Sequence, residues 1–178
     1  MTRKLVGLMA VAMLVAAPAR EAAAQLEKGY TDLGVVVGFG NTGEAGISFG
    51  GRFERVIKDL PSLGGGTLGI QVSADYWSYD YLNYFSYSYL PIGATANYHI
   101  KLENKKIDLF GGAGLGYNII SCDYSGPGVN GADLCDNGSV YFIVKGGARY
   151  FMTPKVALYG DIGTGASALN VGLMFRIK

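Results

Sequence analysis

The sequence is poor in histidine, tryptophan and cysteine, with one, one and two among its 178 residues, and its charges nearly cancel. Lysine and arginine total 15 against 14 aspartates and glutamates, a formal net charge of +1. A nucleic-acid partner normally needs a basic surface, so this balance argues against one. The single histidine lies far from both cysteines, which argues against a metal site. After residue 24 no apolar run is long enough for a transmembrane helix.

The N-terminus has the three parts of a secretory signal peptide. Two basic residues come first, an apolar run follows over residues 5–17, and three alanines stand at 22–24. We predict cleavage after Ala24, with export through the Sec pathway and a mature domain over residues 25–178. An uncleaved anchor is the alternative. The mature chain carries 12 basic and 13 acidic residues, so removing residues 1–24 supplies no basic surface.

The two cysteines enclose a short segment rich in turn-forming residues. Cys122 and Cys135 bracket the sequence DYSGPGVNGADL. Because exported proteins meet an oxidising compartment, we predict a disulfide between them, and two unpaired thiols are the alternative. Such a bond would contribute about 2–4 kcal/mol to stability.

Apolar and polar residues alternate with a period of two along almost the whole mature chain. In TLGIQVSADYW, for example, Leu68, Ile70 and Val72 alternate with Gln71 and Ser73. This period indicates two-faced β-strands. The predicted strands are residues 31–40, 44–54, 67–77, 89–100, 107–119, 139–150, 156–163 and 168–178. We therefore predict an all-β, closed antiparallel eight-stranded up-and-down barrel.

Alternation alone leaves two barrels open, a soluble one with the apolar face inside and a transmembrane one with that face outside. The polar faces carry four basic and four acidic residues, which suits a closed interior where charges must be paired. This predicted interior charge network consists of Arg52, Glu54, Asp75, Asp108, Lys145, Arg149, Asp161 and Arg176. Glycines on the same faces leave room for long side chains. Charges facing water around a soluble barrel are the alternative.

Aromatic residues near the ends of the apolar faces favour the transmembrane barrel. They are Phe39, Tyr76, Tyr98, Tyr117, Tyr150 and Phe175. Interfacial girdles of membrane barrels have this placement. Short turns are expected at residues 101–106 and 151–155, and the segment 56–66 would be an unusually long turn.

The last residues, Asn170 to Ile177, fit the C-terminal pattern polar-x-Gly-x-x-aromatic-x-hydrophobic of bacterial outer-membrane barrels, through Gly172, Phe175 and Ile177. The segments 89–100, 110–117 and 148–161 resemble strands of the small porin-like barrels related to outer membrane proteins A and X. The resemblance implies a multi-pass β-barrel in the outer membrane of a Gram-negative bacterium, with periplasmic termini. It also implies contact with outer-membrane lipids, lipopolysaccharide and the barrel assembly machinery.

Residues suited to catalysis or cofactor binding are scarce. The GGGTLG segment (64–69) fits G-x-G-x-x-G, but a strand follows it where dinucleotide binding needs a helix. His99 is expected on an inward face, where an interior hydrogen bond explains it better than catalysis. Asp123, Asp133 and Asp136 do not match a calcium-binding spacing. We therefore predict no catalytic, cofactor or metal residues.

Eight of the fourteen residues in YWSYDYLNYFSYSY (76–89) are aromatic. A nucleic-acid platform, a sugar-binding surface and a membrane interface all use such residues, and an interfacial girdle explains most of them here. Tyr81, Tyr84 and Phe85, nearest the expected loop tip, are the candidates for binding an extracellular partner. The sequence thus predicts a non-enzymatic barrel with a structural or surface-interaction role. A narrow channel for small solutes and an outer-leaflet lipid-modifying enzyme are the alternatives.

Overall fold

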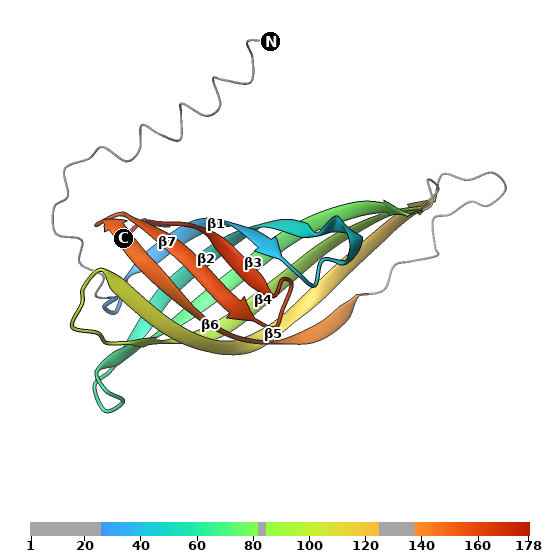
Figure 1. Cartoon of the computed structure of the whole chain (residues 1–178). Helices are drawn as coiled ribbons and strands as arrows, with labels where there is room; N and C mark the ends of the chain where they lie inside the picture. Colours follow the sequence, from blue (N-terminus) through green and yellow to red (C-terminus); the bar gives the residue numbers. More distant parts are fainter. Residues whose placement is uncertain (1–25, 82–84, 125–137) are drawn as a thin grey trace, which may run out of the picture.

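The computed structural model describes residues 26–81, 85–124 and 138–178, which form a closed eight-stranded barrel (Figure 1). Each strand pairs antiparallel with the next, and β8 pairs with β1. The strands are β1 (Thr31–Phe39), β2 (Ile47–Leu60), β3 (Gly66–Tyr81), β4 (Phe85–Ile100), β5 (Ile107–Tyr124), β6 (Ser139–Thr153), β7 (Val156–Gly163) and β8 (Leu169–Arg176). A short 3-10 helix, η2 (Gly43–Ala45), lies between β1 and β2. This architecture confirms the predicted fold class.

The turn between β2 and β3 is shorter than the sequence pattern predicted. β2 continues to Leu60 and β3 begins at Gly66, so the long turn expected over residues 56–66 is wrong. The pairing register shifts between Val56 and Lys58. Such a bulge adds one residue and interrupts the period-two alternation, which hid the end of β2 from pattern analysis.

The strands differ in length, which makes the two ends of the barrel unlike. We call the end that holds residues 26–30 and 176–178 the terminal end, and the opposite one the far end. β3, β4 and β5 have 16, 16 and 18 residues, whereas β1, β7 and β8 have 9, 8 and 8. The long strands reach past the others at the far end (Figure 1). We call their projecting parts, residues 76–81, 85–90 and 119–124, the blade.

The outer surface of the barrel is an apolar band. Leu115 is 52% exposed and Phe142 is 77% exposed, values typical of polar residues in a water-soluble domain. Aromatic side chains flank the band at both ends: Phe39, Tyr76 and Tyr117 toward the far end, and Tyr98, Tyr150 and Phe175 toward the terminal end. Between these groups the outward positions hold apolar residues, alanine or glycine, except for Arg55 of β2, which lies opposite Ile70.

The lumen is filled by side chains, as expected for a barrel of eight strands. Nine of the buried apolar side chains form one cluster in the lumen: Leu26, Tyr30, Val36, Val56, Phe110, Phe151, Ala157, Tyr159 and Met174. Tyr30 and Phe151 meet edge to face there, with ring centroids 6.4 Å apart. Outside this apolar cluster the buried side chains are mostly charged, amide or hydroxyl groups, with Trp77 and Ile143 among the apolar exceptions.

Candidate functional site: the charged lumen and the two mouths

Arg149 of β6 lies fully buried in the terminal half of the lumen. Its guanidinium forms ion pairs with Glu54 of β2 and with Asp108 of β5, the latter at 3.1 Å. The carboxylate of Asp32 on β1 lies 3.6 Å from Nε. One cation thus faces carboxylates from three strands. In a low-dielectric lumen its loss would leave these charges without compensation.

His99 of β4 connects two of the same carboxylates. Its Nδ1 lies 2.9 Å from Asp108 Oδ2, and its Nε2 lies 2.8 Å from Glu54 Oε1. A neutral imidazole has one N–H, so both contacts are hydrogen bonds only if the ring or one carboxyl carries an additional proton. Glu54 also accepts hydrogen bonds from Gln71 Nε2 at 3.0 Å and from Asn97 Nδ2 at 3.1 Å.

A second group of charges lies around Arg52 of β2. Its Nη1 is 2.9 Å from Asp75 Oδ1, and its Nη2 donates to Asn170 Oδ1 at 3.2 Å. Asn170 in turn donates from Nδ2 to Asp161 at 2.9 Å. Amide side chains therefore link one ion pair to the next carboxylate.

Lys145 joins the two groups. Its ammonium lies 3.9 Å from Asp161 Oδ2 and donates a hydrogen bond to Gln71 Oε1. We call the combined set the interior network: Asp32, Arg52, Glu54, Gln71, Asp75, Asn97, His99, Asp108, Lys145, Arg149, Asp161 and Asn170. The network holds five carboxylates and three cations besides His99. Three of the carboxylates share Arg149 as their only permanent cation within the network, and His99 contacts two of these three, so the imidazole lies where positive charge is scarcest.

Glycines on the inward faces make room for this network. A methyl group on Gly112 of β5 would overlap the Asn97 side chain, and one on Gly50 of β2 would overlap Asp75. The glycine-rich run of β5 is therefore explained by the bulky polar side chains of neighbouring strands.

An aromatic pair underlies the Arg149 guanidinium. Phe110 and Tyr159 stack with centroids 5.7 Å apart, and the guanidinium carbon lies 5.3 Å from the Phe110 centroid and 5.8 Å from that of Tyr159. Cation–π attraction is strongest where water is excluded, as it is at this depth. Both rings belong to the apolar cluster, so the network and the cluster meet at this pair.

Seven of the eight residues predicted for the interior charge network lie together: Arg52, Glu54, Asp75, Asp108, Lys145, Arg149 and Asp161. Arg176 does not join them. It is exposed, its guanidinium lies 5.1 Å from the ring centroid of Tyr30, and its Nε donates to the Lys178 carbonyl at 3.2 Å. β8 ends at Arg176, so this side chain lies at the rim and is open to water.

The prediction missed Asp32 and the neutral members of the network. Asp32 occupies an inward position between Thr31 and Leu33, where the alternation already placed it. His99 was expected inward, and the structure adds the two carboxylates that it contacts. Gln71, Asn97 and Asn170 carried the same signal, because each alternates with apolar neighbours.

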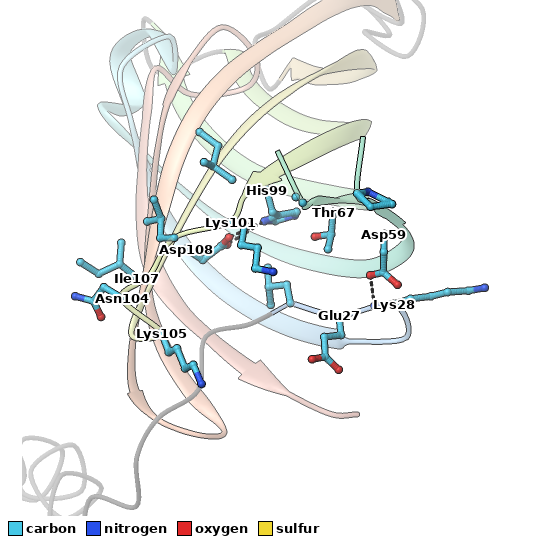
Figure 2. A pocket seen from close by; sticks show the side chains of 16 residues that line it. Glu27, Lys28, Asp59, Thr67, His99, Lys101, Asn104, Lys105, Ile107 and Asp108 are labelled. Atoms are coloured by element: carbon cyan, nitrogen blue, oxygen red, sulfur yellow. Dashed lines mark hydrogen bonds and ion pairs between the residues drawn. The ribbon is translucent and has the colours of Figure 1, made fainter. Parts of the chain in front are cut away.

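The terminal mouth contains a hollow of about 460 Å³ (Figure 2). His99 and Asp108 form its inner wall, and Lys101 and Lys105 line it from the segment between β4 and β5. On the opposite side the backbone N–H of Lys28 donates to Asp59 Oδ1 at 3.0 Å, which holds the segment before β1 across the opening. This hollow mixes both signs of charge.

The inner face of the blade carries a ladder of aromatic rings. Trp77 and Tyr89 stack at 5.2 Å with an interplanar angle of 6°, and Tyr79 continues the stack 6.0 Å from Tyr89. Tyr87 and Phe85 follow it toward the tip, with their centroids 6.3 Å apart. We call these five rings the aromatic ladder.

Apart from Tyr76, Leu90 and Ile119 at its base, the outer face of the blade is polar, so the girdle predicted for most of residues 76–89 is wrong. Its polar residues include Ser78, Asp80, Ser86 and Ser88, and Ser86 Oγ donates to Asp80 Oδ1 at 2.7 Å. Tyr76 alone of the aromatics described in this stretch has the outward register, and it is 48% exposed. Most of these aromatics have odd residue numbers. They face inward because β3 and β4 pair in the blade with the same register as in the rest of the barrel, where the odd-numbered residues also face inward.

A second hollow, of about 380 Å³, lies at the far mouth beside the base of the ladder. We call it the cup. Its walls include Trp77, Tyr79, Tyr89, Asn118, Ser139 and Tyr141. The connections β1–β2 and β7–β8 complete it through Asn41, Gly43, Gly165 and Ala166.

The remaining predicted residues are placed in part. Gly172 and Phe175 lie in β8, and Ile177 follows the strand and donates from its backbone N–H to the Thr31 carbonyl at 2.9 Å. Phe85 belongs to the aromatic ladder, whereas Tyr84 and Cys135 lie outside the described residues, as does the predicted signal peptide. The backbone of Tyr81 ends β3, and Cys122 lies near the far end of β5, opposite Tyr87.

Within the described ranges no helix is long and apolar enough to cross a membrane. Over the same residues no group of three or more His, Cys, Asp and Glu side chains has an arrangement suited to a metal ion.

No family model matches the chain, and neither does any of the curated proteins with which it was compared. Solved structures do match. The N-terminal β-barrel domain of Pseudomonas aeruginosa OprF is 13% identical, with a TM-score of 0.56 over 84% of this chain and 98% of that one. Ail, the attachment invasion locus protein of Yersinia pestis, is 10% identical, with a TM-score of 0.55 over 84% and 96%.

A second structure of Ail, in complex with the heparin analogue sucrose octasulfate, has a TM-score of 0.53 at 9% identity and the same coverage. The likeness extends over nearly all of each matched chain, and at this level of identity it concerns the fold. The chain therefore has the closed eight-stranded barrel fold of small outer-membrane proteins such as Ail and the N-terminal domain of OprF.

Proposed function

We propose that the chain is an integral outer-membrane barrel with a non-enzymatic role, either structural or in surface interaction, such as envelope integrity or adhesion. The distribution of polar residues carries the proposal, because it is the reverse of that in a water-soluble protein: the outer surface is apolar and the buried lumen is ionic. A water-soluble barrel of this pattern would expose a continuous apolar band, which favours association or aggregation. In a bilayer the same band is solvated by lipid.

Membrane integration is tested by heat modifiability and extraction. Unboiled protein should migrate differently from boiled protein on SDS gels, because a closed barrel resists SDS until heated. It should also stay in the membrane fraction after carbonate and urea washes and enter solution only with detergent. Co-migration of the two samples, together with release by salt alone, would contradict the proposal.

The far end is proposed to face outward and the terminal end the periplasm. The blade and the cup would then meet the medium, and the tight turns would face inward. Two variants test this on intact cells with a membrane-impermeant maleimide, each made in a Cys122→Ser, Cys135→Ser background so that it has a single cysteine: Ser78→Cys on the blade and Glu103→Cys in the turn after β4. Both native side chains are exposed. We expect labelling of Ser78→Cys alone, and labelling of Glu103→Cys alone would reverse the orientation.

The interior network also bears on the channel hypothesis. Its ion pairs cross the lumen from Arg149 on β6 to β1, β2 and β5, and Asn170 of β8 bridges Arg52 of β2 and Asp161 of β7. We therefore propose that no solute path runs through the barrel. Recordings in planar bilayers should show no sustained, reproducible conductance, and such a conductance would establish transport instead.

An enzymatic role would need a base that is available for proton transfer. His99 has both ring nitrogens engaged by carboxylates, and its position in the lumen is better suited to structure. Overexpression should leave the lipid A profile unchanged. A changed profile that is lost in His99→Ala would favour the lipid-modifying enzyme.

Two processing events belong to this proposal. We propose that Cys135 pairs with Cys122, which would close the connection after β5, and that the signal peptide is removed after Ala24. Alkylation of the purified protein before and after reduction tests the first, since a disulfide protects both thiols until reduced. N-terminal sequencing tests the second and should begin at Gln25.

A further inference from the structure

The chemistry of the cup is unlike that of the interior network below it. Every described residue that lines the cup is uncharged. Four charged residues, Arg52, Asp75, Lys145 and Asp161, line an adjoining smaller hollow that shares Tyr141, Gly165 and Ala166 with the cup. They are paired with one another, Arg52 with Asp75 at 2.9 Å and Lys145 with Asp161 at 3.9 Å. An ionic ligand would therefore enter the cup without a counter-charge on its walls, which is costly where water is excluded.

The polar groups of the cup are hydroxyls and amides. Hydroxyls come from Tyr79, Tyr89, Tyr141 and Ser139, and each can both donate and accept a hydrogen bond. The side-chain Oδ1 of Asn118 is buried, and nothing among the described residues donates to it. A ligand with hydroxyl groups would satisfy this acceptor once the Asn118 amide turns toward the cup, whereas a purely apolar ligand would leave it unpaired.

The rings of the cup are held in a fixed arrangement. Trp77, Tyr89 and Tyr79 stack nearly parallel, with angles of 6° and 16° between successive planes, and the Tyr79 and Tyr89 hydroxyls are 3.3 Å apart. A cage for a quaternary ammonium instead directs several ring faces at one point. Stacked rings with aligned hydroxyls offer apolar surface beside hydrogen-bonding groups, and a small hydroxyl-rich ligand matches both.

We infer that the cup is a binding site for a neutral carbohydrate, of mono- or disaccharide size. Pyranose rings combine apolar C–H faces with hydroxyls that donate and accept, which is the combination that the walls of the cup present. Its volume of about 380 Å³ lies within the usual range of small-molecule sites. The inference deepens the proposed surface interaction and rests on it, because the far end must face the medium for such a ligand to arrive.

Tryptophan fluorescence provides the test, because Trp77 is the only tryptophan in the chain. The full-length mature protein is folded in octyl-polyoxyethylene micelles, which carry no sugar headgroup. It is titrated with maltose, lactose, N,N′-diacetylchitobiose and sucrose, and separately with sucrose octasulfate. We expect a saturable change in Trp77 emission with at least one neutral disaccharide and weaker binding of the sulfated sugar.

Two variants probe the polar wall of the cup. Asn118→Ala should weaken binding of the responding disaccharide about tenfold or more, because it removes a buried hydrogen-bond acceptor. Tyr141→Phe, which keeps the ring, should weaken it by a smaller factor. The control is Tyr76→Ala, which removes a ring adjacent to Trp77 on the outward face and should leave affinity within about twofold. Heat modifiability verifies that each variant is folded.

Three results would overturn the inference: no saturable response to any neutral disaccharide, tighter binding of sucrose octasulfate, or unchanged affinity in both Asn118→Ala and Tyr141→Phe. The titration does not depend on membrane orientation. If the sugar titration fails while Ser78→Cys is labelled on intact cells, the carbohydrate site is wrong and the outward orientation of the far end stands. If the titration succeeds while Ser78→Cys is not labelled on intact cells, the carbohydrate site stands and the outward orientation is wrong.

Discussion

The terminal half of the lumen and the cup at the far mouth are built from the same inward-facing register, yet they are filled in opposite ways. Around Arg149 the side chains are charged, fully buried and paired across four or more strands. Around Trp77 the described side chains are uncharged, mainly aromatic, amide and hydroxyl groups, and they enclose open space. The difference indicates a division of labour, in which the network holds the strands together and the cup remains available to a ligand.

The largest expected effect is removal of the central cation of the network. Arg149→Met should lower the free energy of unfolding by about 3–5 kcal/mol, because three carboxylates lose their buried partner. Urea titration in lipid vesicles, followed by heat-modifiable mobility, measures the loss. Arg176→Met is the matched control at the exposed rim and should change stability by less than about 1 kcal/mol. Equal losses in the two variants would remove the distinction between network and rim.

A charge placed on the outer surface tests where the membrane ends. Leu115→Arg, in the middle of the apolar band, should cost about 2–4 kcal/mol in a bilayer. Ser88→Arg, on the polar outer face of the blade, should cost about 0–1 kcal/mol, because the blade is proposed to lie outside the hydrocarbon. The same vesicle unfolding assay applies. A large cost for Ser88→Arg would place the blade within the membrane.

Overpacking of the lumen should have an intermediate effect. Gly112→Ala introduces a methyl group that overlaps Asn97, and we expect a loss of about 1–3 kcal/mol. Gly111→Ala is the control one residue away, since its added methyl group faces outward and lies 4.0 Å from the nearest atom, the Lys145 carbonyl oxygen. If both substitutions cost the same, backbone conformation and not lumen packing explains the glycines.

The smallest effect is expected at the aromatic ladder. Tyr89→Ala removes the ring stacked on Trp77 and should cost about 0.5–1.5 kcal/mol beyond the loss of buried area. Because Trp77 is 7% exposed, its emission should also shift to longer wavelength as water reaches the indole. Emission spectra in micelles, with Tyr76→Ala as the control, measure the shift. An unchanged spectrum would mean that the stack does not shield Trp77.

The fold could be predicted because alternation with a period of two is a local property that a closed barrel leaves visible in every strand. The alternation correctly assigned Arg52, Asp75 and Asp108 to the inward face of the barrel. Alternation gives the face of a residue but not its depth along the barrel, which is why Arg176 was grouped with a network it does not reach. The bulge after Val56 interrupts the period, so the end of β2 could not be read from the pattern.

The cup could not be predicted from the sequence. Its walls come from β3, β4, β5, β6 and two connections, and their relative heights follow from the pairing offsets between strands. Those offsets are not encoded in any single strand. The aromatic content of residues 76–89 was visible, but which rings faced the lumen depended on β3 and β4 keeping one register into the blade.

The pairing of each strand with its chain neighbour has a consequence for the order of assembly. Seven of the eight seams join strands adjacent in sequence, whereas the β1–β8 seam joins residues as distant as Asp32 and Arg176. Loop-closure entropy is greatest for that seam, so it is expected to form late. Asp32 reaches Arg149 only across a closed lumen. The full desolvation of the guanidinium is therefore coupled to closure, and an open sheet of the same strands would keep these charges in contact with water.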